Sequence, residues 1–145
     1  VGVILGADIV VAAQSAAFGL PEIDRGLWPF MVSVLLAQHV SPKVAMDLML
    51  TGRRFDAAEA LSIGLLSRVV PDGALDDQVE ALVATLAAAA PLAVREGKAA
   101  FLSLLDTGDA LEQMQQRLTA LTQTADVAEG IAAFRERRPP HWQGR

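Results

Sequence analysis

The tripeptide Pro71-Asp72-Gly73 separates two halves of the chain that differ in the spacing of their apolar residues. Before it, short β-branched runs alternate with loops and single helices. After it, apolar residues recur every three or four positions, as they do on one face of an α-helix. Because such a stripe must pack against another surface, we expect an α/β segment over residues 1–71 and a mostly helical region over residues 72–145.

The first half is expected to contain short strands and turns. Residues 2–7 are compatible with the end of a helix. The β-branched run at residues 9–12 predicts a buried strand, and residues 17–19 predict a short extended piece. Residues 65–70 predict another short strand. Pro21, Gly26 and Pro29 indicate a loop between the extended piece and the next helix.

Several helix boundaries can be predicted from capping residues. Residues 30–39 are apolar nearly all round, which predicts a buried helix, and Ser41-Pro42 is an N-cap followed by proline at the first helical position of a helix that runs to residue 50. Asp56 and Glu59 have capping-box spacing, in which each side chain binds a free backbone N–H. Gly64 fits the position just after a helix end.

The second half is expected to form amphipathic helices. Pro91 predicts the start of a helix that ends near Gly108, Asp109 and Glu112 have capping-box spacing, and a last helix at residues 127–135 is stopped by Pro139-Pro140. Two apolar stripes mark further helices, one that precedes Pro91 and one that follows Asp109. Their members are Leu75, Val79, Leu82, Val83 and Leu86, then Leu111, Met114, Leu118 and Leu121.

Composition excludes several kinds of site. The 145 residues are 52% hydrophobic and 20% charged, which is typical of a globular chain. Cysteine is absent and the two histidines lie far apart, so we expect neither disulfides nor a metal site. A net charge of −5 argues against a nucleic-acid-binding protein. The sequence also lacks a phosphate-binding loop, a nucleophile elbow and a His-Glu-x-x-His helix.

The apolar opening, residues 1–13, is interrupted by Asp8 and is shorter than the roughly 20 apolar residues that span a bilayer. It has no basic leader, so we expect neither a membrane span nor a secretory signal, and we predict a cytoplasmic location. The chain begins without methionine inside an apolar segment. Our interpretation is that it is part of a longer protein.

Glu22 is the strongest candidate for acid/base chemistry. Its neighbours in sequence are mostly apolar. Apolar surroundings destabilise the charged form of a carboxyl group, which then holds its proton up to the pH range where proton transfer in enzymes takes place. Composition alone favours the other interpretation, in which Glu22 faces solvent or pairs with Arg25 on a turn. Asp24 shares its face if the segment is extended.

Other polar and aromatic residues have ordinary structural interpretations. Asp8 is expected to cap or bind backbone. Trp28 fits either the core or the wall of a substrate site. Arg53-Arg54 follows a helix end, where we expect a surface pair that interacts with the helix dipole and not a pair that binds phosphate. The basic tail, with Arg135, Arg137, Arg138 and Arg145 against the single Glu136, is typical of a solvated helix end.

Three segments around Glu22 form a set when they are taken together and in order: Ala7-Asp8-Ile9, residues 17–23 (AFGLPEI) and residues 26–29 (GLWP). They resemble the patterns C-D-I, F-G-x-P-E and G-x-x-P of the crotonase superfamily, specifically of the enoyl-CoA hydratase/isomerase type. Three further blocks agree in order. They are residues 50–53 (LTGR), residues 57–71 with AAEA, GL and VVP, and residues 129–139 with EGIAAF and RRP.

The resemblance implies a fold of stacked ββα turns, of which residues 1–71 are the C-terminal part, followed by a helical oligomerisation region at residues 72–145. It implies a homotrimer or hexamer in the full-length protein, with the N-terminal half of the family domain absent here. It also implies an acyl-CoA substrate, with coenzyme A as part of the substrate, no other cofactor and no metal. The two backbone N–H groups of the oxyanion hole would precede Val1.

The resemblance assigns Glu22 to the second of the two glutamates that hydratases of this family use. The first falls on Gly2, which has no acid/base group, and residues 30–33 (FMVS) replace a glycine-rich stretch. Bulkier side chains there should reshape the acyl pocket. The substrate-binding residues expected from the resemblance are Leu20, Pro21, Trp28, Pro29, Phe30 and Arg137, the last as a contact to CoA phosphates.

Three functions remain open from the sequence. The first is hydration of a 2-enoyl-CoA thioester with Glu22 as acid/base. The second is isomerisation of a 3-enoyl-CoA to a 2-enoyl-CoA by Glu22 alone, supported by the oxyanion hole. The third is a non-catalytic crotonase-fold binding protein, or an inactive fragment whose apolar stripes promote aggregation.

Overall fold

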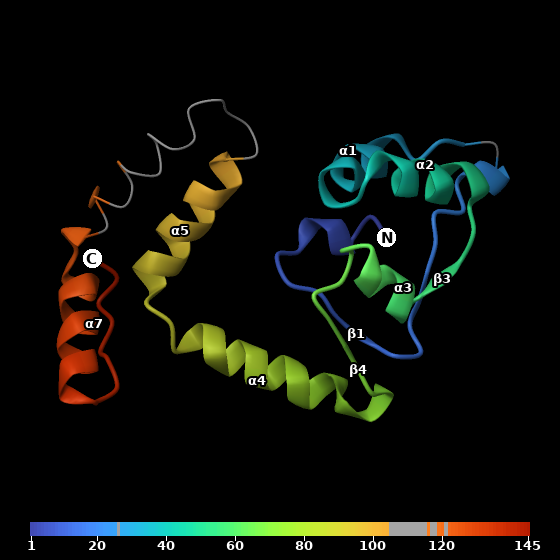
Figure 1. Cartoon of the computed structure of the whole chain (residues 1–145). Helices are drawn as coiled ribbons and strands as arrows, with labels where there is room; N and C mark the ends of the chain where they lie inside the picture. The colour runs from blue at the N-terminus through green and yellow to red at the C-terminus, as the bar shows by residue number, and fades with distance from the viewer. Residues whose placement is uncertain (26, 105–115, 117–118, 121) are drawn as a thin grey trace. The chain divides into compact units, whose positions relative to one another are not determined.

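The computed structural model describes residues 1–25, 27–104, 116, 119–120 and 122–145 (Figure 1). The chain folds as two compact units, residues 1–82 and 83–145. The first unit contains, in order, η1 (Ile4–Gly6), β1 (Val11–Ala13), β2 (Ala17–Phe18), η2 (Ile23–Arg25), α1 (Phe30–His39), α2 (Pro42–Thr51), β3 (Phe55–Asp56), α3 (Ala57–Ser62), β4 (Arg68–Val70), η3 (Asp72–Ala74) and the start of α4 (Leu75–Ala87).

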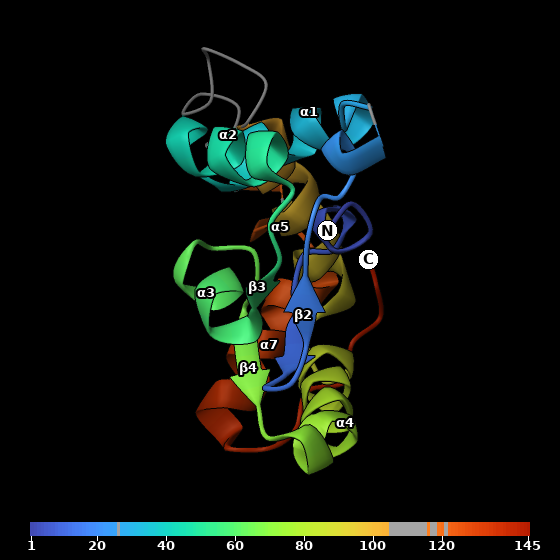
Figure 2. The same ribbon diagram turned by 90° about the vertical axis from the view of Figure 1, so that its right-hand side faces the viewer.

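Two short strand pairs organise the first unit. β1 and β4 are parallel, with Val11 opposite Arg68, and they lie side by side in Figure 1. β2 and β3 are antiparallel, with Phe18 opposite Phe55. The strand predicted at residues 9–12 is therefore confirmed with its bounds moved by one or two residues, whereas β3 has no counterpart among the predicted elements. In Figure 2, α1 and α2 lie above these strands.

The predicted helix boundaries of the first unit are mostly confirmed. The Ser41 side chain accepts a hydrogen bond from the Val44 amide, and Pro42 is the first residue of α2. After α3, the Gly64 amide binds the Leu61 carbonyl and the Leu65 amide binds the Ala60 carbonyl, which is a Schellman motif with Gly64 at φ 86°. Only a residue that tolerates left-handed backbone suits that position.

The core of the first unit lies between the helices and the strands. Its fully buried side chains include Leu36 of α1 and Leu48 of α2, and both are 0% exposed. The other buried members are Leu5, Ala12, Leu20, Val40, Ala45, Met49, Phe55, Ala57, Ala60, Leu65 and Leu66.

One expectation for α1 is wrong. The helix has the predicted bounds, but it is not buried on all sides, because Phe30 and Met31 are 73% and 84% exposed and Val34 is also exposed. The described residues cover only the face that carries Leu36. An apolar composition all round the helix shows which side chains could be buried, but not which of them are.

The second unit contains the end of α4, then α5 (Pro91–Ser103) and α7 (Ala125–Glu136). Pro91 begins its helix as predicted, and α7 contains the predicted residues 127–135 with two or fewer added at each end. Gly108, the second capping box and the apolar stripe that starts at Leu111 lie outside the described residues. The division into a core of residues 1–71 and an oligomerisation region of residues 72–145 stays a prediction.

The C-terminal tail is fixed along α7 by carboxylates of that helix. Asp126, which is 2% exposed, accepts hydrogen bonds from the amides of Gln143 and Gly144 at 2.6 and 3.0 Å. Trp142 donates its ring N–H to the Ala88 carbonyl at 2.9 Å. A tail that was predicted to be solvated is therefore bound to its own unit.

Glu129 holds the same tail through Arg138, which donates to both of its carboxylate oxygens, and through the His141 amide at 2.8 Å. These hydrogen bonds lower the pKa of Glu129 from 4.5 to about 2. Those from Arg138 have the largest effect, and the one from the His141 amide has the next largest. Arg138 also contacts Glu136, so its positive charge is paired with two carboxylates. From the sequence we had counted only Glu136 against the basic residues of the tail.

A carboxylate whose pKa is lower in the folded state stabilises that state above its unfolded pKa, and the contribution is lost as the pH falls through the folded value. We therefore expect the tail to loosen as the pH falls from 4.5 to about 2. Fluorescence of Trp142 in a Trp28→Phe background reports this change. Glu129→Gln should remove the acid-dependent step, and an identical pH titration in both proteins would contradict the assignment.

Candidate active site around Glu22

Glu22 lies on the loop that connects β2 to α1. The loop is anchored at both ends by buried residues, Leu20 before Glu22 and Pro29 at the start of α1. Within it, the Leu27 amide donates to the Glu22 carbonyl at 3.0 Å, and the Phe30 amide donates to the Trp28 carbonyl at 2.8 Å. These bonds turn the chain back toward α1, so the position of Glu22 is set by backbone contacts.

The side chain of Glu22 is half-buried, and its oxygen Oε2 is enclosed. Among the residues that the structure describes, none makes a hydrogen bond to that oxygen. Buried polar atoms are nearly always paired, because leaving one unpaired costs the free energy of its lost hydration. An enclosed carboxylate oxygen without a protein partner is suited to binding a proton or a polar group of a bound molecule.

A hollow of about 400 Å³ lies next to this loop and falls in the size range of small-molecule sites, roughly 300–1,000 Å³. It carries one carboxylate, Asp24, and one guanidinium, Arg54. The complete lining is Ala17, Phe18, Gly19, Pro21, Asp24, Gly52 and Arg54. Of the predicted site residues, only Pro21 contributes to this wall.

The other predicted substrate-binding residues differ in their environments. Leu20 and Pro29 are buried, Trp28 is half-buried against the core of the first unit, and Phe30 is exposed. Arg137 belongs to the second unit. It directly follows α7, is exposed, and has left-handed backbone with φ 55°. Leu20, Pro21, Trp28 and Pro29 share the loop with Glu22, Phe30 begins α1, and Arg137 lies in the other unit.

Gly2, where the family pattern led us to expect a glutamate, faces α1. A Cβ atom added to Gly2 would lie 3.1 Å from Cγ2 of Val32, which is closer than an ordinary contact. Val32 belongs to residues 30–33, the segment that replaces the glycine-rich stretch. The two departures from the family pattern thus meet in space, because the Val32 side chain occupies the room next to Gly2.

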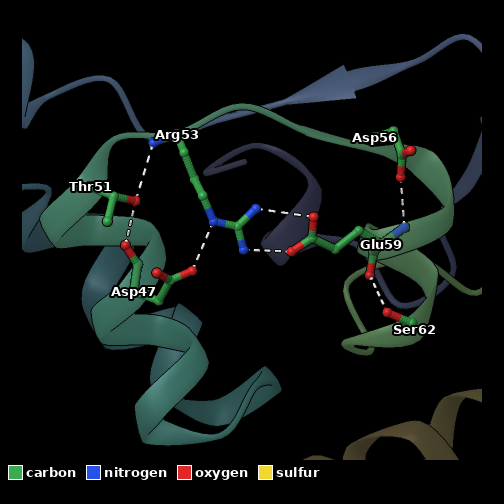
Figure 3. Close-up of polar contacts among 6 residues, drawn as sticks. All are labelled: Asp47, Thr51, Arg53, Asp56, Glu59 and Ser62. Atoms are coloured by element: carbon green, nitrogen blue, oxygen red, sulfur yellow. Dashed lines mark hydrogen bonds and ion pairs between the residues drawn. The ribbon is translucent and has the colours of Figure 1, made fainter.

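Arg53 is a residue whose environment the sequence did not predict. Its Nε–H donates to Asp47 at 2.8 Å, and its two terminal nitrogens donate to the two oxygens of Glu59 (Figure 3). The hydrogen bond from Arg53 is the main reason that the pKa of Glu59 is lowered, and the bond to Glu59 is the main reason that the pKa of Arg53 is raised. Arg53 therefore connects α2 to α3.

This network corrects two expectations. Arg53 does not simply lie at the end of α2, because its guanidinium is held by carboxylates of two helices. The capping box is only half formed. Asp56 accepts from the Glu59 amide at 2.8 Å as predicted, but the Glu59 side chain binds Arg53 instead of the backbone at Asp56. The one signal in the sequence is that acids lie six residues before and six after Arg53.

A protein-family model described as enoyl-CoA hydratase/isomerase matches residues 1–145, the whole of the chain. The chain belongs to the enoyl-CoA hydratase/isomerase family of the crotonase superfamily. The family assignment suggested by the motifs around Glu22 is thereby confirmed, as is a partial crotonase fold with few strands and many helices. The relatives described next are named as enzymes.

Individual relatives agree with the family assignment. A Thermus thermophilus protein named as an enoyl-CoA hydratase is 39% identical over 146 aligned positions, which cover 97% of this chain and 56% of that protein. Carnitinyl-CoA dehydratase of Citrobacter koseri is 34% identical and covers 97% of this chain and 57% of its own. The crystal structure of a Mycobacterium smegmatis enoyl-CoA hydratase superposes with a TM-score of 0.92 at 32% identity, covering 97% of this chain and 56% of that one.

The chain thus spans a little over half the length of these relatives. Over the described ranges, no group of three or more His, Asp or Glu side chains could hold a metal ion. In the same residues, no single helix is long and apolar enough to cross a bilayer. The helical segments 72–87 and 91–103 meet that criterion only when they are taken together.

Proposed function

We propose that the protein acts on an acyl-CoA thioester and hydrates a 2-enoyl-CoA, with Glu22 as the acid/base group. The observation that supports this proposal is the enclosed Oε2 of Glu22, which has no partner among the described residues. A carboxylate held in this way can accept a proton from water and donate one to a carbon atom of the substrate. Its neighbours on the loop, from Leu20 to Phe30, would contact the acyl part.

In the hydration, Glu22 takes a proton from water while the water oxygen bonds to C3 of the enoyl thioester. The electron pair of the double bond moves toward the thioester carbonyl, and a proton is then delivered to C2. The net change is the addition of one water molecule. With a single carboxylate, Glu22 both removes a proton from water and returns one to C2.

Gly2 favours a second reaction, the isomerisation of a 3-enoyl-CoA. Since residue 2 has no acid/base group and Val32 fills the adjacent space, a second carboxylate is absent from that position. In this reaction Glu22 removes a proton from C2, the double bond moves to C2–C3, and the proton is returned at C4. No water is consumed.

We further propose that Arg137 contacts the CoA phosphates, for which a guanidinium is well suited, and that the full-length protein is a homotrimer or hexamer. Coenzyme A would enter as part of the substrate, without a further cofactor. A cytoplasmic location completes the proposal.

The test supplies the full-length protein with a 2-enoyl-CoA and a 3-enoyl-CoA in parallel and identifies the products by mass spectrometry. Hydration adds the mass of water, whereas isomerisation moves the double bond at constant mass. Binding of a saturated acyl-CoA is measured on the same sample.

A hydrated product supports the main proposal, and an isomer formed only from the 3-enoyl-CoA supports the second. Tight binding of the saturated acyl-CoA without turnover of either substrate would contradict both reactions and identify a binding protein.

A further inference from the structure

The loop that carries Glu22 rests on the segment between α2 and α3, residues 52–56, and makes contact with it on both sides of Glu22. On the N-terminal side, β2 pairs with β3, so that Phe18 lies opposite Phe55, and the two rings stack with centroids 5.8 Å apart. A Cβ atom on Gly19 would lie 3.6 Å from the Arg53 carbonyl oxygen, which is an ordinary van der Waals distance.

On the C-terminal side, Gly52 touches η2. A Cβ atom on Gly52 would lie 2.9 Å from Cγ2 of Ile23, the residue that directly follows Glu22. Gly52 has left-handed backbone with φ 61°, where glycine is favoured, and its amide closes α2 by binding the Leu48 carbonyl at 3.1 Å. The absence of a side chain lets the loop approach this closely.

The supporting segment is itself fixed by Arg53. The backbone N–H of Arg53 donates to the Thr51 hydroxyl, which in turn donates to the Asp47 carbonyl at 2.7 Å (Figure 3). The guanidinium binds Asp47 of α2 and Glu59 of α3, and its Cζ lies 5.9 Å from the centre of the Phe55 ring. One side chain thus fixes the segment to both flanking helices and to the ring that stacks on Phe18.

We propose that Arg53 is a positioning residue for Glu22, which it places by holding residues 52–56 against both sides of the Glu22 loop. The effect of Arg53 on catalysis rests on the proposed acid/base role of Glu22, whereas its effect on the order of the loop does not. Lysine can replace Arg53 only in part, because a point charge cannot bind a carboxylate with two parallel hydrogen bonds while it also contacts a second carboxylate and an aromatic face.

The first measurement is independent of activity. Hydrogen exchange of the Leu27 amide, which is bonded to the Glu22 carbonyl, reports how well the loop is ordered. In Arg53→Met, exchange at Leu27 should rise by roughly tenfold or more, since hydrogen bonds to a charged group are lost. Glu59→Gln should also raise the exchange rate of the Leu27 amide. In the double variant, the increase should be smaller than the sum of the increases in the two single variants.

The second measurement is the kinetics of the full-length protein with its enoyl-CoA substrate. Arg53→Met should lower kcat by about 10- to 100-fold with a smaller change in KM, because a catalytic group displaced by about 1 Å loses its reacting geometry while substrate contacts remain. Arg53→Lys should recover only part of the loss. Two controls accompany these variants. Arg95→Met removes an exposed ion pair on α5, and Leu92→Ala lowers the stability of the second unit.

Faster exchange at Leu27 together with a lower kcat, both absent from the controls, supports the proposal. Unchanged exchange at Leu27 in Arg53→Met overturns it, and so does an unchanged kcat in an active protein. If the wild-type protein turns over neither substrate but Leu27 exchange still rises, positioning of the loop stands and the proposed function fails. Where Arg53→Met does not fold, Arg53→Lys and Glu59→Gln give the same readouts.

Discussion

Replacing Glu22 by glutamine is expected to lower the turnover of enoyl-CoA by about 10²- to 10⁴-fold, which is the usual contribution of a positioned acid/base group. Glutamine has the same shape but cannot exchange a proton with the substrate. The buried Oε2 atom of Glu22 makes no hydrogen bond to the described residues, so the substitution breaks no described hydrogen bond of that oxygen. Affinity for a saturated acyl-CoA should therefore change little.

The control for Glu22→Gln is Glu80→Gln, which alters an exposed carboxylate of α4 in the same chemical way. Turnover numbers and acyl-CoA affinity are measured side by side for both variants and the wild type. Equal kcat values for wild type and Glu22→Gln would remove Glu22 from the mechanism. Loss of binding together with turnover would assign it to substrate attachment instead.

Truncation of Leu48 to alanine is expected to destabilise the first unit by about 2–5 kcal/mol, since it removes a buried side chain and leaves a cavity. Leu48 is 0% exposed and belongs to the core between α2 and the strands. The measurement is the midpoint of urea unfolding of the full-length protein, followed by circular dichroism. A shift to lower urea at unchanged slope indicates a loss of stability.

Leu50→Ala provides the matched comparison, because the same residue type lies on the same helix but is 55% exposed. Its effect should stay within about 0.5 kcal/mol, as is usual for surface positions. A destabilisation by Leu50→Ala as large as that by Leu48→Ala would show that the exposed face of α2 is covered in the full-length protein. An effect of Leu48→Ala as small as that expected for Leu50→Ala would contradict the core described for the first unit.

The helix boundaries were predictable because capping is local chemistry. Ser41, Asp56 and Gly64 each act within a few residues, so the sequence contains both the donor and the acceptor. The pairing of β1 with β4 and of β2 with β3 joins residues about 40 to 60 positions apart. Strands of two or three residues are too short to show a period, which is why β3 was missed.

The candidate site was only partly predictable. Glu22 and its loop could be selected because the surrounding motif is contiguous in the chain. Arg53 could not, since a charged residue after a helix is ordinarily solvated and its partners come from two different helices. Asp126 was likewise missed, because its hydrogen bonds reach Gln143 and Gly144, which lie 17 and 18 residues further along the chain.

The contact between Gly2 and Val32 restricts how this chain can diverge. A side chain introduced at residue 2 alone would meet Val32 at 3.1 Å, so the neighbour must move by a few tenths of an ångström before any carboxylate fits. Trimming Val32 alone would leave an unfilled space beside glycine. We therefore expect the two positions to be epistatic: a glutamate introduced at residue 2 should be tolerated best in a protein whose residue 32 is already smaller.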